Sequence, residues 1–139
     1  TVDIFRAGSK PTQKSSSAWF TGVVWQDPIV EAPEPARVRA VKVTFEPGAR
    51  TAWHTHPLGQ TLHLISGIGL IGLRDDHPKI INAGDTVWIP PNEEHWHGAT
   101  PTNSMTHIAI QESMNGSVAN WLEKLTDAEY KSLYLSLQK

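Results

Sequence analysis

Short stretches of alternating apolar and polar residues fill most of the chain before residue 112. Within residues 37–45, Val41, Val43 and Phe45 fall on one face. Lys42 and Thr44 fall on the other face, and this alternation is typical of a half-buried strand. The pattern predicts strands over residues 19–25, 37–45, 51–56, 61–66, 69–73, 79–82, 86–89, 95–99 and 104–111.

Glycine and proline residues separate nearly all of these stretches. Pro28, Pro33 and Pro35 are expected to interrupt the chain between the first two predicted strands. Many short strands with such turns predict an all-β sandwich or barrel, because units that alternate strand and helix need longer helical segments between the strands.

The C-terminal part has a different pattern. Its apolar residues have helical spacing and lie at positions 118, 121, 122, 125, 130, 133, 134, 135 and 137. Thr126 and Glu129 have the spacing of a capping box, which marks the start of a helix. We therefore predict two short helices, over residues 118–125 and 127–137, packed outside the β domain.

The length of 139 residues predicts a single domain over residues 1–139, with a β-barrel over about 18–112 and a helical segment over 118–137. Apolar residues make up 39% and charged residues 19%, which supports a packed core and excludes a disordered chain. The net charge of −2 is unlike that of proteins that bind nucleic acid or anionic lipid. We therefore do not expect nucleic acid as a partner. The sequence also has no apolar run of about 20 residues, so a membrane is not expected as a partner either.

The absence of cysteine limits the chemistry of the protein. It excludes disulfides, zinc–thiolate sites, iron–sulfur clusters and thiol nucleophiles, and leaves histidine, carboxylates, hydroxyls or a metal without thiolate ligands. The first residue is Thr1, which fits a cleaved signal peptide, a removed initiator methionine or a trimmed chain. We expect a cytoplasmic protein, or a periplasmic one if an N-terminal signal has been removed.

Two pairs of histidines carry the clearest chemical signal. His54 and His56 are two residues apart on a predicted strand, so both imidazoles project from one face and can bind one metal ion. Gln60 follows a turn and can return to the same point. His95 and His97 repeat this spacing. Chance pairs of surface or core histidines are the alternative, but the regular glycine and proline punctuation around both pairs favours a metal site.

These segments resemble the two motifs of the cupin family. Residues 48–67 match the pattern G(x)5HxH(x)3-4E(x)6G except that Gln60 replaces the glutamate. In the second motif Gly84, Pro90 and His95 match, whereas Asn92 and Ala99 differ. The resemblance implies a double-stranded β-helix, or jelly-roll barrel. It also implies a metal ion held by His54, His56, Gln60 and His95, and dimerisation through edge strands or swapped N-terminal segments.

Residues 44–61, 95–99 and 105–112 further resemble small bacterial cupins that include manganese-dependent hydroxynitrile lyases. This likeness implies cleavage of (R)-cyanohydrins such as mandelonitrile into an aldehyde and hydrogen cyanide, and the reverse addition. As a partner we expect a second copy of the chain in a homodimer, or further copies in a higher homo-oligomer. The alternatives are a metal-dependent cupin dioxygenase or other oxidoreductase, and a cupin that binds a small molecule without turnover. The missing glutamate argues against a dioxygenase that uses this residue as a base.

A glutamine at position 60 changes the expected charge of the metal site. Three neutral imidazoles and one neutral amide leave a dipositive ion its full charge, which favours binding of anions such as cyanide. The hard amide oxygen favours Mn(II) or Fe(II), while Ni(II), Co(II) or Zn(II) can compete by affinity. Four protein ligands leave open positions on an octahedral ion, as a catalytic site requires.

The alternation of the strands also suggests proton-transfer residues. His97 shares the face of His95, and His107 shares the face of Gln111, so we predict His97, His107 and Gln111 as catalytic residues. A buried, hydrogen-bonded core histidine is the alternative for His107. The apolar cavity for the small-molecule substrate is expected to be lined by Val41, Val43, Phe45, Leu62 and Leu64. His63 and His77 are interpreted as non-functional.

Overall fold

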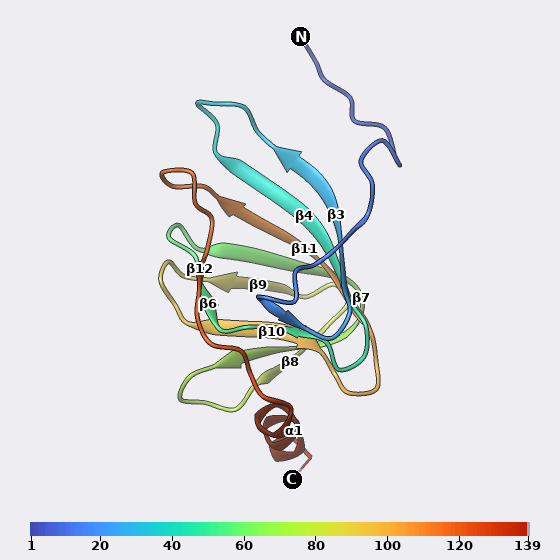
Figure 1. Ribbon diagram of the computed structural model, residues 1–139, viewed down its shortest axis with the longest axis vertical. Helices are drawn as coiled ribbons and strands as arrows, with labels where there is room; N and C mark the ends of the chain where they lie inside the picture. The colour runs from blue at the N-terminus through green and yellow to red at the C-terminus, as the bar shows by residue number, and fades with distance from the viewer. Residues whose placement is uncertain (139) are drawn as a thin grey trace.

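The computed structural model describes residues 1–138. Its elements are β1 (Gln13–Lys14), β2 (Phe20–Thr21), β3 (Val24–Glu31), β4 (Val38–Phe45), β5 (Arg50–Thr51), β6 (His54–Thr55), β7 (Gln60–Leu73), β8 (Lys79–Asn82), β9 (Thr86–Ile89), β10 (His95–Ala99), β11 (Met105–Glu112), β12 (Asn120–Trp121) and α1 (Asp127–Ser136). The all-β prediction is confirmed, and the strands form one curled antiparallel sheet (Figure 1).

Strand β7 gives the sheet its curl. Its first half pairs with β11 and β9, and its second half pairs with β10 and β8. The main strand order is β1-β3-β4-β11-β7-β10-β5-β2, with β6 and β12 extending from β10. The long strand therefore passes from one side of the barrel to the other and encloses the interior between the two sides.

Alternation along the strands decides which side chains face that interior. In β11, His107 and Ala109 are buried whereas Ile110 is exposed, and in β7 Leu62 and Leu64 are buried whereas Ile65 is exposed. The main core combines these inward residues with those of β3, β4 and β9. The period of two in the sequence thus becomes an apolar inner face, as expected for strands that are half buried.

The predicted strand boundaries are partly correct. Strands β8, β9 and β10 have the predicted bounds, whereas the predicted strands 61–66 and 69–73 form the single strand β7. The predicted strand 51–56 is interrupted between β5 and β6, where Ala52 N–H donates to the Trp19 carbonyl and Trp53 N–H donates to the Glu123 carbonyl. Stretch 19–25 is also divided, at Gly22, whose φ of 81° favours glycine.

Pro28 does not break the chain as predicted. Strand β3 continues through it, and the register with β4 shifts between Pro28 and Val30. On the other side of β3, strand β1 pairs only with Trp25 and Gln26. No strand pairs with Pro28 on that side, so the missing N–H of the proline costs no hydrogen bond there. A proline is compatible with a strand at such an unpaired edge and beside a bulge.

The helix predicted over residues 118–125 is wrong. The segment is extended, and its residues 120–121 form β12 against β6. Leu122 N–H donates to the Trp53 carbonyl at 2.8 Å, and the Glu123 carbonyl accepts from Trp53 N–H at 2.9 Å. The helical spacing of apolar residues arises because Trp121 turns to the barrel interior while Leu122 and Leu125 join a second apolar cluster.

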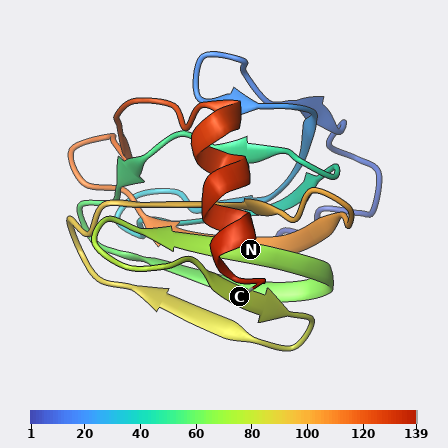
Figure 2. The ribbon, with the colours of Figure 1, turned by 90° about the horizontal axis from the view of Figure 1, so that it is seen from below.

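The second predicted helix is confirmed as α1. Both halves of its capping box are present, with Thr126 Oγ1 accepting from Glu129 N–H and Glu129 accepting from Thr126 N–H. The helix covers one end of the barrel (Figures 1 and 2). It buries Tyr130 against Trp96 in the second cluster. Among residues 1–138, no helix has both the length and the apolar character needed to cross a membrane.

Candidate metal centre

The barrel encloses a cavity of about 220 Å³, open at one side. Its walls are largely apolar, and its polar groups are concentrated among histidines and glutamines. The lining residues are Phe20, Gln26, Val41, Val43, Thr51, His54, His56, Gln60, His97, His107, Ala109, Gln111, Val118, Ala119 and Trp121. Six of the seven predicted site residues are in this set, and His95 lies directly behind them with its ring centroid 4.2 Å from that of His54.

Backbone carbonyls fix the tautomers of the three histidines predicted as ligands. Nδ1 of His54 lies 2.9 Å from the Ala52 carbonyl, Nδ1 of His95 lies 2.9 Å from the Glu93 carbonyl, and Nδ1 of His56 lies 2.7 Å from the Val118 carbonyl. A carbonyl can only accept, so each Nδ1 carries the proton and each Nε2 keeps its lone pair. This is the hydrogen-bond arrangement that orients histidine ligands in metal sites.

The Gln60 amide is oriented by a second glutamine. Gln60 Nε2 donates to Gln111 Oε1 at 3.0 Å, and Gln111 Nε2 donates to the Arg39 carbonyl at 3.3 Å. Gln60 Oε1 is therefore left on the histidine side, 3.4 Å from His95 Nε2. Two acceptor atoms that face each other at this distance repel unless a cation or proton lies nearby.

The free acceptors fit a metal ion. The His56 Nε2 atom is buried and has no hydrogen-bond partner among residues 1–138. Ring nitrogens of His54, His95 and His97 all lie within 4.8 Å of one another, and the His56 ring centroid lies 4.9 Å from that of His54. Imidazole nitrogens and an amide oxygen are a suitable donor set for a first-row divalent ion. The centre thus contains a buried three-histidine cluster compatible with a metal, made of His54, His95 and His97. His56, which the sequence predicts as a ligand, is not part of this cluster, whereas His97, which it predicts as a proton-transfer residue, is.

His97 and His107 form a hydrogen-bonded pair. His97 Nδ1 and His107 Nε2 are 3.0 Å apart, so one donates to the other. His97 is held further by its backbone N–H, which donates to Thr51 Oγ1 at 3.1 Å. Its Nε2 is buried and unpartnered within the described chain. Because its Nδ1 faces another imidazole instead of a carbonyl, the backbone does not fix the tautomer of His97.

Burial keeps these imidazoles neutral. It lowers the pKa of His95 to about 4 and that of His107 to about 4. The pKa values of His54 and His97 lie well below the ordinary range, first because of burial and then because other histidines stand close by. The His56 pKa is lowered by burial as well. Neutral imidazoles are the form that binds metals and accepts protons.

Several cavity residues were outside the sequence prediction. Phe20, Gln26 and Trp121 line the cavity, because β2, β3 and the 118–125 segment approach it. The register between β3 and β4 places Gln26 beside Val43, and this pairing cannot be predicted from the local sequence pattern. Conversely, of the five apolar residues expected to line the cavity, only Val41 and Val43 do so. The side chains of the other three lie in the core, namely Phe45, Leu62 and Leu64.

The two remaining histidines lie outside the cavity. His63 is exposed and contacts Thr86 Oγ1 at 2.9 Å, and His77 is exposed and contacts Ser136 Oγ at 3.1 Å. Neither residue is among those that line the cavity.

Comparison with known proteins identifies the class. The Cupin domain family matches residues 41–110, and the chain belongs to the cupin family. It is also 51% identical over 130 residues to a protein from Granulicella tundricola named (R)-mandelonitrile lyase, a match that covers 94% of this chain and 99% of that relative.

Solved structures agree with the family assignment. A cupin-like protein from Thermotoga maritima superposes with a TM-score of 0.81 at 41% identity, over 95% of this chain and 97% of that one. A polyketide cyclase from Streptomyces resistomycificus superposes with a TM-score of 0.75 at 16% identity, over 99% of both chains, which shows a shared fold.

Proposed function

We propose that this protein is a metal-dependent lyase that cleaves and forms (R)-cyanohydrins. The observation that carries the proposal is the extensive identity with a relative named (R)-mandelonitrile lyase, over nearly the whole length of both chains. The buried cluster of histidines beside a small, mostly apolar cavity supports it. Enzyme activity on a small molecule is also in keeping with the enzymes among its structural neighbours.

We assign His54, His56, His95 and Gln60 as the residues that would hold the ion. The first three each keep an Nε2 lone pair, and the Gln60 amide presents its oxygen to them. Mn(II) is the ion we expect first, with Fe(II), Ni(II), Co(II) or Zn(II) as competitors. A bound dipositive ion would lower the pKa of a substrate hydroxyl placed beside it.

Other residues of the cavity bind the substrate and transfer the proton. Apolar side chains such as Val41, Val43 and Trp121 bind the aryl or alkyl group and exclude water. His97 Nε2 accepts the hydroxyl proton, and His107 holds the His97 ring through its other nitrogen. The bond between the carbinol carbon and the nitrile carbon breaks as the carbonyl forms, and its electron pair leaves with cyanide. His97 then returns the proton, so the products are an aldehyde and HCN.

The test is to incubate the manganese-loaded protein with racemic mandelonitrile and to measure benzaldehyde and the remaining enantiomers. We expect benzaldehyde release with loss of the (R)-enantiomer. The variant His54→Ala/His56→Ala should lose both the bound ion and the activity, whereas a matched variant at the two surface histidines, His63→Ala/His77→Ala, should retain both. Benzaldehyde release no faster than that of the metal-stripped protein would refute the proposal. Oxygen consumption by the Fe(II)-loaded protein with phenols would instead support the oxidoreductase alternative.

A homodimer is a further proposal. Four exposed apolar side chains, Val38, Ile65, Trp88 and Ile110, point outward from the neighbouring strands β4, β7, β9 and β11. A second copy could cover them, and analytical ultracentrifugation measures the oligomeric state directly. The cytoplasmic location stays a prediction from the sequence.

A further inference from the structure

His56 depends on a distant part of the chain. His54 and His95 each donate from Nδ1 to a carbonyl two residues earlier on the same segment. The corresponding acceptor for His56 is the carbonyl of Val118, which lies 62 residues later. The orientation of His54 and His95 is therefore set locally, whereas that of His56 is set by the segment that contains Val118.

That segment, residues 118–125, is called here the C-terminal strap. Its first part contributes Val118, Ala119 and Trp121 to the cavity wall. Strand pairing places Asn120 opposite Thr55 and Trp121 opposite His54. The strap thus pairs with β6, which contains His54 and ends one residue before His56, and its Val118 carbonyl accepts from His56 Nδ1.

An aromatic contact holds the strap near Val118. The rings of Trp19 and Trp121 stack with centroids 5.6 Å apart and an interplanar angle of 10°. Trp121 lies between Trp19 and the metal centre, with its ring centroid 4.6 Å from that of His54. Trp19 is 40% exposed and does not line the cavity, so its side chain contacts the strap without reaching the proposed substrate site.

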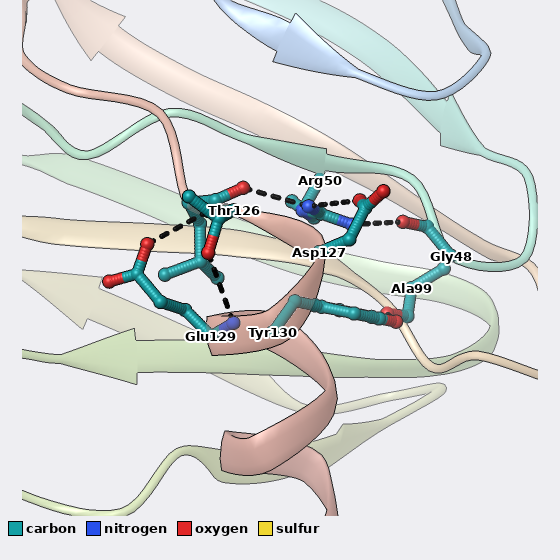
Figure 3. Close-up of polar contacts among 8 residues, drawn as sticks. Gly48, Arg50, Ala99, Thr126, Asp127, Glu129 and Tyr130 are labelled. Carbon is teal, nitrogen blue, oxygen red and sulfur yellow. Dashed lines mark hydrogen bonds and ion pairs between the residues drawn. The ribbon is translucent and has the colours of Figure 1, made fainter.

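A buried arginine holds the other end of the strap (Figure 3). Arg50 is 3% exposed, and its Nη2 donates to the Leu125 carbonyl at 2.7 Å and to Asp127 Oδ1 at 2.8 Å. Its Nη1 donates to the Gly48 carbonyl at 3.2 Å, which ties the strap to the turn before β5. The guanidinium lies 4.5 Å from the centre of the Tyr130 ring. The Tyr130 hydroxyl in turn donates to the Ala99 carbonyl of β10 at 2.6 Å.

We propose that the C-terminal strap fixes the His56 imidazole for metal binding, and that Trp19 and Arg50 are positioning residues that pin the strap at Trp121 and Leu125. The inference rests on the proposed metal centre and adds to it two residues that touch neither ion nor substrate. When either contact is lost, the Val118 carbonyl moves from His56 Nδ1, and the imidazole can adopt the other tautomer or turn away.

The first test is nitrogen NMR of ¹⁵N-histidine-labelled, metal-free protein at a pH where imidazoles are neutral. In the wild type, His54, His56 and His95 should each show a protonated Nδ1 and an unprotonated Nε2. In Trp19→Leu and in Arg50→Met, the His56 signals should change to a mixture of tautomers while those of His54 and His95 stay unchanged. A single, unchanged His56 tautomer in both variants would overturn the inference.

The second test measures Mn(II) affinity in a double-mutant cycle. We expect Trp19→Leu and Arg50→Met each to weaken Mn(II) binding about tenfold or more, as loss of groups that orient ligands typically does. In a His56→Ala background, neither substitution should weaken binding further. The matched controls are Trp25→Leu and Arg37→Met, which alter an exposed tryptophan of β3 and an exposed arginine, neither of which lines the cavity, and should leave affinity unchanged.

The outcomes separate the two proposals. If the wild type binds no metal ion, the proposed function fails, and the His56 tautomer alone decides the inference. If Trp19→Leu and Arg50→Met weaken binding equally with and without His56, the strap acts on the whole fold and the inference is wrong. Should Arg50→Met fail to fold, Tyr130→Phe replaces it, because this variant removes only the hydroxyl that bonds to Ala99.

Discussion

His107 makes the metal-free protein sensitive to acid. The side chain is fully buried, and burial lowers its pKa from 6.5 to about 4. In the unfolded chain the same imidazole is exposed and has an ordinary pKa. Below pH 6.5 the unfolded chain therefore binds a proton that the folded chain does not bind. The contribution of His107 to stability is complete above pH 6.5 and is lost as the pH falls toward 4.

The size of this effect on stability follows from the difference between the pKa values of His107 in the folded and the unfolded chain. A difference of about 2.5 pKa units corresponds to about 3 kcal/mol over the full range, and to about 2 kcal/mol between pH 7 and pH 5. The unfolding free energy of a domain is about 5–15 kcal/mol in total, so one histidine accounts for a measurable share. The other buried histidines of the centre act in the same direction, because burial lowers their pKa values too.

Urea unfolding at a series of pH values measures the contribution. Wild type and His107→Leu, both stripped of metal with a chelator, are compared at pH 7, 6 and 5. Between pH 7 and pH 5 the wild type should lose about 2 kcal/mol more unfolding free energy than the variant does, whatever the offset between the two proteins at pH 7. Parallel stability curves would show that His107 titrates alike in both states, and would refute the reasoning.

Three further outcomes concern the centre itself. His97→Ala should reduce mandelonitrile turnover about 100-fold or more and leave the metal content unchanged, whereas His107→Ala should reduce turnover less. Steady-state kinetics measures turnover and elemental analysis measures the metal content. A larger loss of turnover in His107→Ala than in His97→Ala would exchange the roles of the two histidines. Gln111→Leu removes the acceptor of Gln60 Nε2. The Mn(II) affinity, measured by calorimetry, should therefore fall about twofold to tenfold. An unchanged affinity would contradict the role of Gln111 in orienting Gln60. Addition of Mn(II) at about 100 times its Kd should stabilise the stripped protein by about 2.7 kcal/mol in chemical unfolding, and no gain would contradict binding to the folded state.

Much of the centre could be predicted because its signals are local. A strand of period two places His107, Ala109 and Gln111 on one face once any one of them is known to point inward, and all three line the cavity. Strand β10 has the bounds that the turns around it indicate. Spacing within one strand is short-range geometry, so sequence alone is enough to derive it.

The strap could not be predicted for the opposite reason. Its apolar residues have helical spacing, yet its backbone bonds to Trp53 and pairs with β6, partners that lie far away in the sequence. The group that orients His56 is the carbonyl of Val118, which carries no side-chain signal at all. Tertiary pairing therefore overrides a local preference that is weak over so short a segment.

The departure from the cupin motif at position 60 is explained by a residue on another strand. The Arg39 carbonyl can only accept, so Gln111 directs its Nε2 to that carbonyl, and Oε1 is the atom that faces Gln60 Nε2. A glutamate at position 60 would place a carboxylate oxygen against that Oε1, and Gln111 could not turn without losing its bond to Arg39. A neutral amide at position 60 donates to Gln111 Oε1 and leaves its own oxygen on the side of His95. Gln60 and Gln111 are thus a matched pair, and the choice of an uncharged ligand at the proposed metal centre is built into β11 as much as into the histidine motif.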